Sequence, residues 1–110
     1  MSEFTDIIRS EKPTLVDFFA TWCGPCKMQS PILEQVKAKV GDQANIIKID
    51  IDKNQALAAQ YRVQSVPTLM IFVAGEPVWR GVGVHQAADL ESLIYARLTP
   101  KDTTNNKSQE

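Results

Sequence analysis

The chain has 110 residues, of which 44% are hydrophobic and 23% charged, and its formal net charge is -1. This length supports a single domain with a core of its own. The balanced charge argues against nucleic-acid binding and against a basic membrane-binding surface. The longest apolar stretches, such as residues 69–74, are far shorter than the roughly 20 residues of a membrane span.

The N-terminal residues 1–12 mix acidic and basic side chains without the apolar segment of a secretory signal peptide. We therefore expect a cytoplasmic protein, or a periplasmic one if a leader has been removed. Phe4, Ile7 and Ile8 recur at helical spacing and predict a short helix over residues 2–10.

A strand and a long helix are predicted next. Residues 14–20 are apolar on both faces, as in the central strand of a sheet. A helix is predicted from Cys23 to about Val40, with Gly41 as its stop and Pro31 as a source of a kink. Its expected buried stripe consists of Met28, Ile32, Leu33, Val36 and Val40.

The remaining elements alternate between strands and helices. We predict a strand over 46–51, a helix over 55–61, a strand over 68–73 and a last strand over 78–82, with Gly75 and Glu76 as the hairpin turn. A final helix should bury Leu90, Leu93, Ile94 and Leu98. Residues 1–99 are thus expected to form one domain and residues 100–110 a disordered polar tail.

The only two cysteines, Cys23 and Cys26, lie two residues apart just after the first strand. At the start of a helix, unpaired backbone N–H groups and the helix dipole stabilise a thiolate. Gly24 allows a tight turn, and Pro25 suits the first helical turn. We expect an exposed Cys23 to attack a substrate disulfide and a more covered Cys26 to resolve the mixed disulfide.

Two other interpretations of this cysteine pair have less support from the sequence. A structural zinc ion usually takes four Cys or His ligands, and the chain offers only one histidine, the distant His85, besides the two cysteines. A purely structural disulfide would close a loop too short to stabilise the fold much. No metal, flavin or nucleotide motif is visible, so we expect no cofactor.

Three separated segments together carry a resemblance to a known family. Residues 22–27 read Trp-Cys-Gly-Pro-Cys-Lys, residues 16–19 before them read Val-Asp-Phe-Phe, and residues 66–68 read Val-Pro-Thr. In order and spacing they resemble thioredoxin over roughly residues 2–98. The resemblance implies an α/β thioredoxin fold, with a mixed four-stranded sheet flanked by helices and the first family strand absent or trimmed.

The resemblance also implies an activity and partners. It predicts a monomeric protein-disulfide reductase that acts on disulfide-containing proteins and is recharged by an NADPH-dependent thioredoxin reductase. Two alternatives stay open: a thiol oxidase or isomerase in an oxidising compartment, and a binding subunit that does not use its redox chemistry. The Gly-Pro pair between the cysteines favours the reductase, because it lacks the histidine of strongly oxidising relatives.

Asp17 is an acid in an otherwise apolar strand, where burial should raise its pKa. The resemblance implies that it accepts the proton of Cys26. The alternative is a structural pairing of Asp17 with Lys48, which lies in the next predicted strand, and the two roles can coexist.

The resemblance further implies a cis Val66–Pro67 peptide bond that faces the cysteines and leaves the Val66 backbone free to pair with a substrate. The expected substrate surface is a flat apolar patch formed by Trp22, Gly24, Pro25, Val66 and Gly83. Trp79 is interpreted as a packing residue, and His85 as a solvated loop residue. The strand over 46–51 is expected to be an exposed sheet edge.

Overall fold

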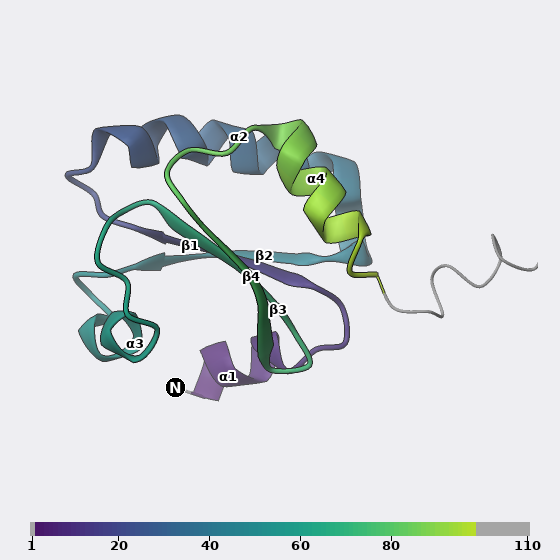
Figure 1. The fold of residues 1–110 in the computed structure, drawn as a ribbon, viewed down its shortest axis with the longest axis horizontal. Helices are drawn as coiled ribbons and strands as arrows, with labels where there is room; N and C mark the ends of the chain where they lie inside the picture. Colours follow the sequence, from purple (N-terminus) through teal and green to yellow (C-terminus); the bar gives the residue numbers. More distant parts are fainter. Residues whose placement is uncertain (1, 99–110) are drawn as a thin grey trace, which may run out of the picture.

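The computed structural model describes residues 2–98, which form one four-stranded sheet with helices on both faces (Figure 1). Helices α1 (Ser2–Ile8) and α3 (Gln55–Gln60) lie on one side of the sheet, and α2 (Gly24–Val40) and α4 (Ala87–Tyr95) lie on the other. The predicted α/β class with a mixed four-stranded sheet is confirmed. The predicted tail, residues 100–110, lies outside the described residues.

The sheet combines parallel and antiparallel strands in the order β2-β1-β3-β4. The parallel pair is β1 (Thr14–Phe19) with β2 (Asn45–Asp50). The antiparallel pairs are β1 with β3 (Thr68–Val73), and β3 with β4 (Glu76–Val82). As predicted, β2 is an edge strand. The central strand β1 leads directly into the turn that carries the cysteines.

Alternating side chains of β1 reach two separate hydrophobic clusters. Leu15 packs with residues of α2 and α4, whereas Val16 and Phe18 pack with residues of α1 on the other face. All three side chains are fully buried, as expected for a strand that is covered on both faces. Because side chains alternate along a strand, Asp17 shares the face of Leu15 and lies on the side covered by α2.

Helix α2 ends where the sequence predicts, and Leu33, Val36 and Val40 of its predicted stripe are buried, but the stripe differs near the start of the helix. Gly41 has a φ of 57° and donates its N–H to the Lys37 carbonyl, which closes the helix. Met28 is 64% exposed, so its prediction as a buried residue was wrong. Gln29 is fully buried instead, because it follows the buried Cys26 by three residues and therefore lies on the same helix face.

Several boundaries differ from the predictions: α1 ends at Ile8 instead of residue 10, and the ends of β1, β2 and α3 differ by one residue. The hairpin turn is formed by Ala74 and Gly75, whose φ angles are 52° and 86°, so β4 begins at Glu76 instead of Val78. Helix α4 ends at Tyr95, which leaves Leu98 beyond the helix. A short 3-10 helix, η1 (Gly41–Gln43), connects α2 to β2. Within residues 2–98, helices are too short or too polar to cross a membrane.

Candidate functional site

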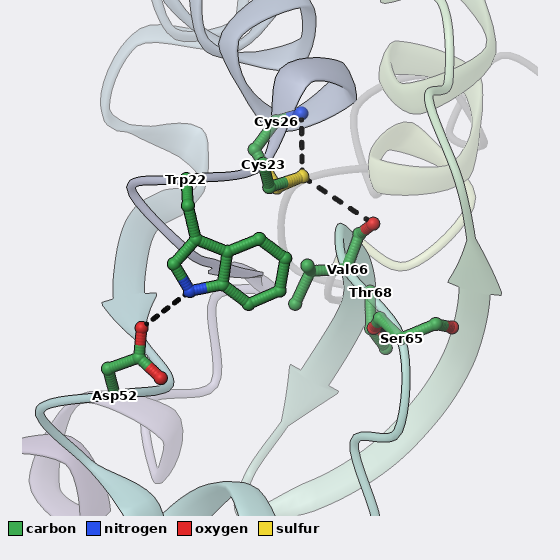
Figure 2. The surroundings of a disulfide bond; sticks show 7 residues. All are labelled: Trp22, Cys23, Cys26, Asp52, Ser65, Val66 and Thr68. Atoms are coloured by element: carbon green, nitrogen blue, oxygen red, sulfur yellow. Dashed lines mark hydrogen bonds between the residues drawn. A yellow bond between two sulfur atoms is a disulfide. The ribbon is translucent and has the colours of Figure 1, made fainter.

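The two cysteines form a disulfide at the start of α2 (Figure 2). Cys23 is the N-cap residue, with an extended backbone, and Pro25 occupies the first turn, where its missing N–H removes no helical hydrogen bond. The backbone N–H of Cys26 donates to the Cys23 sulfur at 3.1 Å. In the reduced protein the same N–H and the positive end of the helix would stabilise a thiolate on Cys23.

Both cysteines are covered to a similar extent. Cys23 is 5% exposed and Cys26 4%, so the expectation of an exposed Cys23 was wrong. The physical reason is packing: the pair forms a small cluster with Ala20, and Phe19, Ile51 and Val66 pack against it.

The loop before β3 lies opposite the cysteines. The Val66 carbonyl oxygen is 3.6 Å from the Cys23 sulfur (Figure 2), and the Val66–Pro67 peptide bond is cis, as the resemblance implied. On its other side, the Pro67 carbonyl accepts a hydrogen bond from the Gly83 N–H at 2.9 Å. Three segments far apart in the sequence, around Cys23, Val66 and Gly83, therefore meet at one place.

Trp22 is the most exposed large hydrophobic residue described in the structure, at 68%. Its indole Nε1–H donates to a carboxylate oxygen of Asp52 at 2.9 Å, which fixes the ring beside the disulfide (Figure 2). Sequence reasoning missed Asp52. The only local signal was its place in the turn just after β2, where its own N–H donates to the Asp50 side chain.

Asp17 is a fully buried acid, and neither of its carboxylate oxygens has a hydrogen-bond partner among the described residues. Burial raises the pKa of Asp17 to about 6, and the nearby positive charge of Lys48 opposes this rise. A carboxyl group with a pKa in this range changes its protonation state close to neutral pH.

The alternative role for Asp17 is a structural pairing with Lys48, and the structure shows no hydrogen bond between the two side chains. The two residues are opposite each other in the β1–β2 register. However, the Lys48 ammonium donates to the Ser30 hydroxyl at 2.8 Å and lies 4.8 Å from the centre of the Phe19 ring. Lys48 thus acts on Asp17 through its charge, without a hydrogen bond.

His85 is more enclosed than a solvated loop residue. Its ring packs edge-to-face on Trp79, with the ring centres 5.2 Å apart, and its backbone is hydrogen-bonded to the side chain of Gln29. Trp79 packs against the core, as predicted. Across residues 2–98, we find no cluster of three or more His, Cys, Asp or Glu side chains arranged to hold a metal ion.

In comparisons with known proteins, the matching family model and two of the similar sequences are those of thioredoxins or thioredoxin-like proteins. The family model described as Thioredoxin matches residues 1–96. The chain is 58% identical over 81 residues to the thioredoxin-like protein slr0233 of Synechocystis, covering 74% of this chain and 77% of that protein. It is 46% identical over 97 residues to a thioredoxin of Staphylococcus saprophyticus, covering 88% and 92%.

The chain is also similar to part of a longer, bifunctional protein and to a solved thioredoxin structure. A bifunctional thioredoxin reductase/thioredoxin of Mycobacterium leprae matches at 46% identity over 89 residues, which are 81% of this chain and 19% of that protein. A mutant thioredoxin from Halobacterium salinarum superposes with a TM-score of 0.82 at 39% identity, covering 90% of this chain and 86% of that one. This chain therefore belongs to the thioredoxin family of protein-disulfide oxidoreductases.

Proposed function

We propose that Cys23 is the attacking thiol and Cys26 the resolving thiol of a protein-disulfide reductase. The Cys23 thiolate attacks one sulfur of a substrate disulfide and releases the other as a thiolate, which leaves a mixed disulfide. The Cys26 thiolate then attacks the Cys23 sulfur, releases the second substrate thiolate and closes the Cys23–Cys26 disulfide. The substrate gains two electrons and the protein loses them.

The observation that carries this assignment is the hydrogen bond from the Cys26 N–H to the Cys23 sulfur at the first turn of α2. An N–H donor favours the charged form of the sulfur that it contacts. Cys23 also lies nearer to the loop before β3, since its sulfur contacts the Val66 carbonyl. The thiolate would thus form on the sulfur that faces the proposed substrate surface.

Asp17 would accept the proton that Cys26 loses before it attacks. Its carboxylate oxygens are buried and free of hydrogen bonds from the described residues, and its pKa is about 6. A general base is most effective when its pKa lies near the working pH. The charge of Lys48 would help to keep Asp17 ionised for this step.

The proposed substrate surface consists of apolar and backbone groups around the disulfide: Trp22, Gly24, Pro25, Val66, Pro67 and Gly83. Its centre is the exposed Trp22 ring, which Asp52 holds in place. The backbone beside Val66 would pair with an extended segment of the substrate, because main-chain hydrogen bonds recognise a strand without regard to most side chains.

The proposed physiological setting is the cytoplasm, with an NADPH-dependent thioredoxin reductase as the electron donor and a monomer formed by residues 1–99 as the active unit. The fused reductase/thioredoxin of Mycobacterium leprae supports the reductase as partner, because two fused activities commonly act in sequence. The two cysteines of the C-x-x-C motif are the only cysteines in the sequence. The absence of further structural disulfides is typical of proteins from a compartment that keeps thiols reduced.

The experiment follows NADPH oxidation with a purified thioredoxin reductase, this protein and insulin as the disulfide substrate. We expect turnover that saturates with insulin and requires both cysteines. A parallel reaction replaces the reductase and NADPH with dithiothreitol. Activity with dithiothreitol alone would contradict the proposed electron donor, whereas no insulin reduction in either reaction would contradict the proposed function itself.

A further inference from the structure

The side chain of Gln29 holds the loop between β4 and α4 by two hydrogen bonds. Its Nε2–H donates to the His85 carbonyl at 3.0 Å, and its Oε1 accepts from the His85 N–H at 2.7 Å. The carboxamide therefore pairs with both backbone groups of one residue, much as a neighbouring strand would. The two residues are 56 positions apart in the sequence.

The position of Gln29 makes this pairing unusual for a helix core. It lies on the buried face of α2 between Cys26 and Leu33, and it is fully buried. A buried amide is unfavourable unless its polar atoms are hydrogen-bonded. Here the partners are backbone groups of the loop. The amide is therefore satisfied only when the loop has this conformation, and the amide in turn stabilises that conformation.

From His85 the contacts continue toward the disulfide. The His85 Nδ1 is 2.9 Å from the Gly83 carbonyl oxygen, which can only accept, so Nδ1 carries the proton. The Gly83 N–H in turn donates to the Pro67 carbonyl at 2.9 Å. Gln29 is thus connected through two loop residues to the turn that faces Cys23.

The other side of the loop is fixed by packing on β4. The His85 ring stacks edge-to-face on Trp79. Both rings lie over Gly81, where an added Cβ would come within 2.6 Å of the indole and 2.8 Å of the imidazole. The segment over residues 83–85 is therefore held from α2 by the hydrogen bonds of Gln29 and from β4 by the packing of Trp79 on the His85 ring.

We propose that Gln29 is a positioning residue that holds residues 83–85 in the place where they contact a protein substrate. The inference rests on the proposed function, because Gly83 belongs to the proposed substrate surface. Gln29 acts through the loop and not on the reacting sulfurs. Its loss should weaken the binding of a folded or extended protein substrate, while thiol chemistry with a small disulfide continues unchanged.

The test compares Gln29→Met and Gln29→Asn with the wild-type protein. Methionine fills a similar volume without hydrogen bonds, and asparagine keeps the amide on a chain too short to reach the same partners. Each variant is assayed with dithiothreitol and insulin for kcat and KM, and in its reduced form with the small disulfide DTNB. Val36→Ala serves as the matched control, because it removes buried volume from the same helix face away from the loop.

We expect both Gln29 variants to raise the KM for insulin by about fivefold, with kcat and the DTNB rate near wild type. Amide hydrogen exchange should also show faster exchange at His85 and Gly83 but not in β1. Val36→Ala should leave the KM unchanged. An unchanged KM in folded Gln29 variants, or equal losses with insulin and DTNB, would overturn the inference. Absence of insulin reduction by the wild-type protein would instead overturn the proposed function.

Discussion

Cys26→Ser is expected to stop turnover after the first chemical step and to accumulate a covalent complex with the substrate. Without the Cys26 thiol, nothing in the chain attacks the Cys23 sulfur, since these two cysteines are the only ones present. The mixed disulfide then persists until an external thiol releases it. Incubation of the reduced variant with insulin, followed by non-reducing electrophoresis and mass spectrometry, measures this complex directly.

The matched control is Cys23→Ser, which should form no such complex and show no turnover. Both serine variants differ from wild type by one atom, so their folds can be compared by circular dichroism. If Cys23→Ser accumulated the complex and Cys26→Ser did not, the two roles would have to be exchanged. Turnover by either variant at the wild-type rate would remove the dithiol mechanism.

Asp17→Asn is expected to stabilise the fold at neutral pH. Asp17 is fully buried, and its pKa is raised from 3.8 to about 6, so its ionised form is disfavoured in the folded protein. A shift of this size corresponds to about 3 kcal/mol as an upper limit, and we expect a gain of about 2 kcal/mol at pH 8. Urea denaturation of both proteins at pH 8 and pH 4 measures the difference.

The pH dependence has a definite sign. Between pH 4 and pH 6 the unfolded chain has lost the Asp17 proton while the folded protein retains it. The folded state then binds more protons, so the stability of the wild-type protein should fall as pH rises through this window and level off above it. The asparagine side chain of the variant does not titrate, so the gain should vanish toward pH 4. A gain of equal size at both pH values would contradict the raised pKa.

The same substitution should slow the attack of Cys26 on the mixed disulfide by tenfold or more at pH 7, as expected for the loss of a general base. In the wild-type protein the rate of this step should rise with pH through about 6, as Asp17 ionises. The variant should lack this rise. Stopped-flow measurement of tryptophan fluorescence, to which Trp22 and Trp79 both contribute, follows the step during a single turnover.

Asp52→Asn provides the control for the loss of one negative charge near the site. Asp52 is exposed, and an asparagine oxygen can still accept the indole hydrogen bond. Stability and resolution rate should both stay close to wild type. If Asp17→Asn behaved like Asp52→Asn in the single turnover, the proton-transfer role of Asp17 would be contradicted.

Strong local signals made most of the fold predictable. The apolar run of β1, the Gly41 helix stop and the span of β3 all agree with the structure. The hairpin boundary was wrong because Ala74 adopts a positive φ, which a non-glycine residue seldom does and which its local sequence does not indicate. The end of α4 was wrong because Leu98 continues the apolar spacing beyond the last helical residue.

At the candidate site, the segments were predictable but the contacts between them were not. The motifs located Cys23, Asp17 and Pro67, whose residue types are constrained by chemistry or backbone geometry. Hydropathy placed Met28 in the core and gave no reason to bury Gln29, because an amide is favourable there only when a distant backbone supplies both partners. Both partners are backbone groups of His85, which only the tertiary structure brings close to Gln29.

The reduction potential of the Cys23/Cys26 pair tests the assignment as a reductase most directly. The protein would be equilibrated in dithiothreitol buffers of graded potential, and its free thiols trapped and counted. We expect a value well below the cytosolic glutathione couple, which lies at about -220 to -260 mV by extraction methods, so that electrons flow from this protein to its substrates. A value well above that range would contradict the assignment and indicate an oxidant or isomerase.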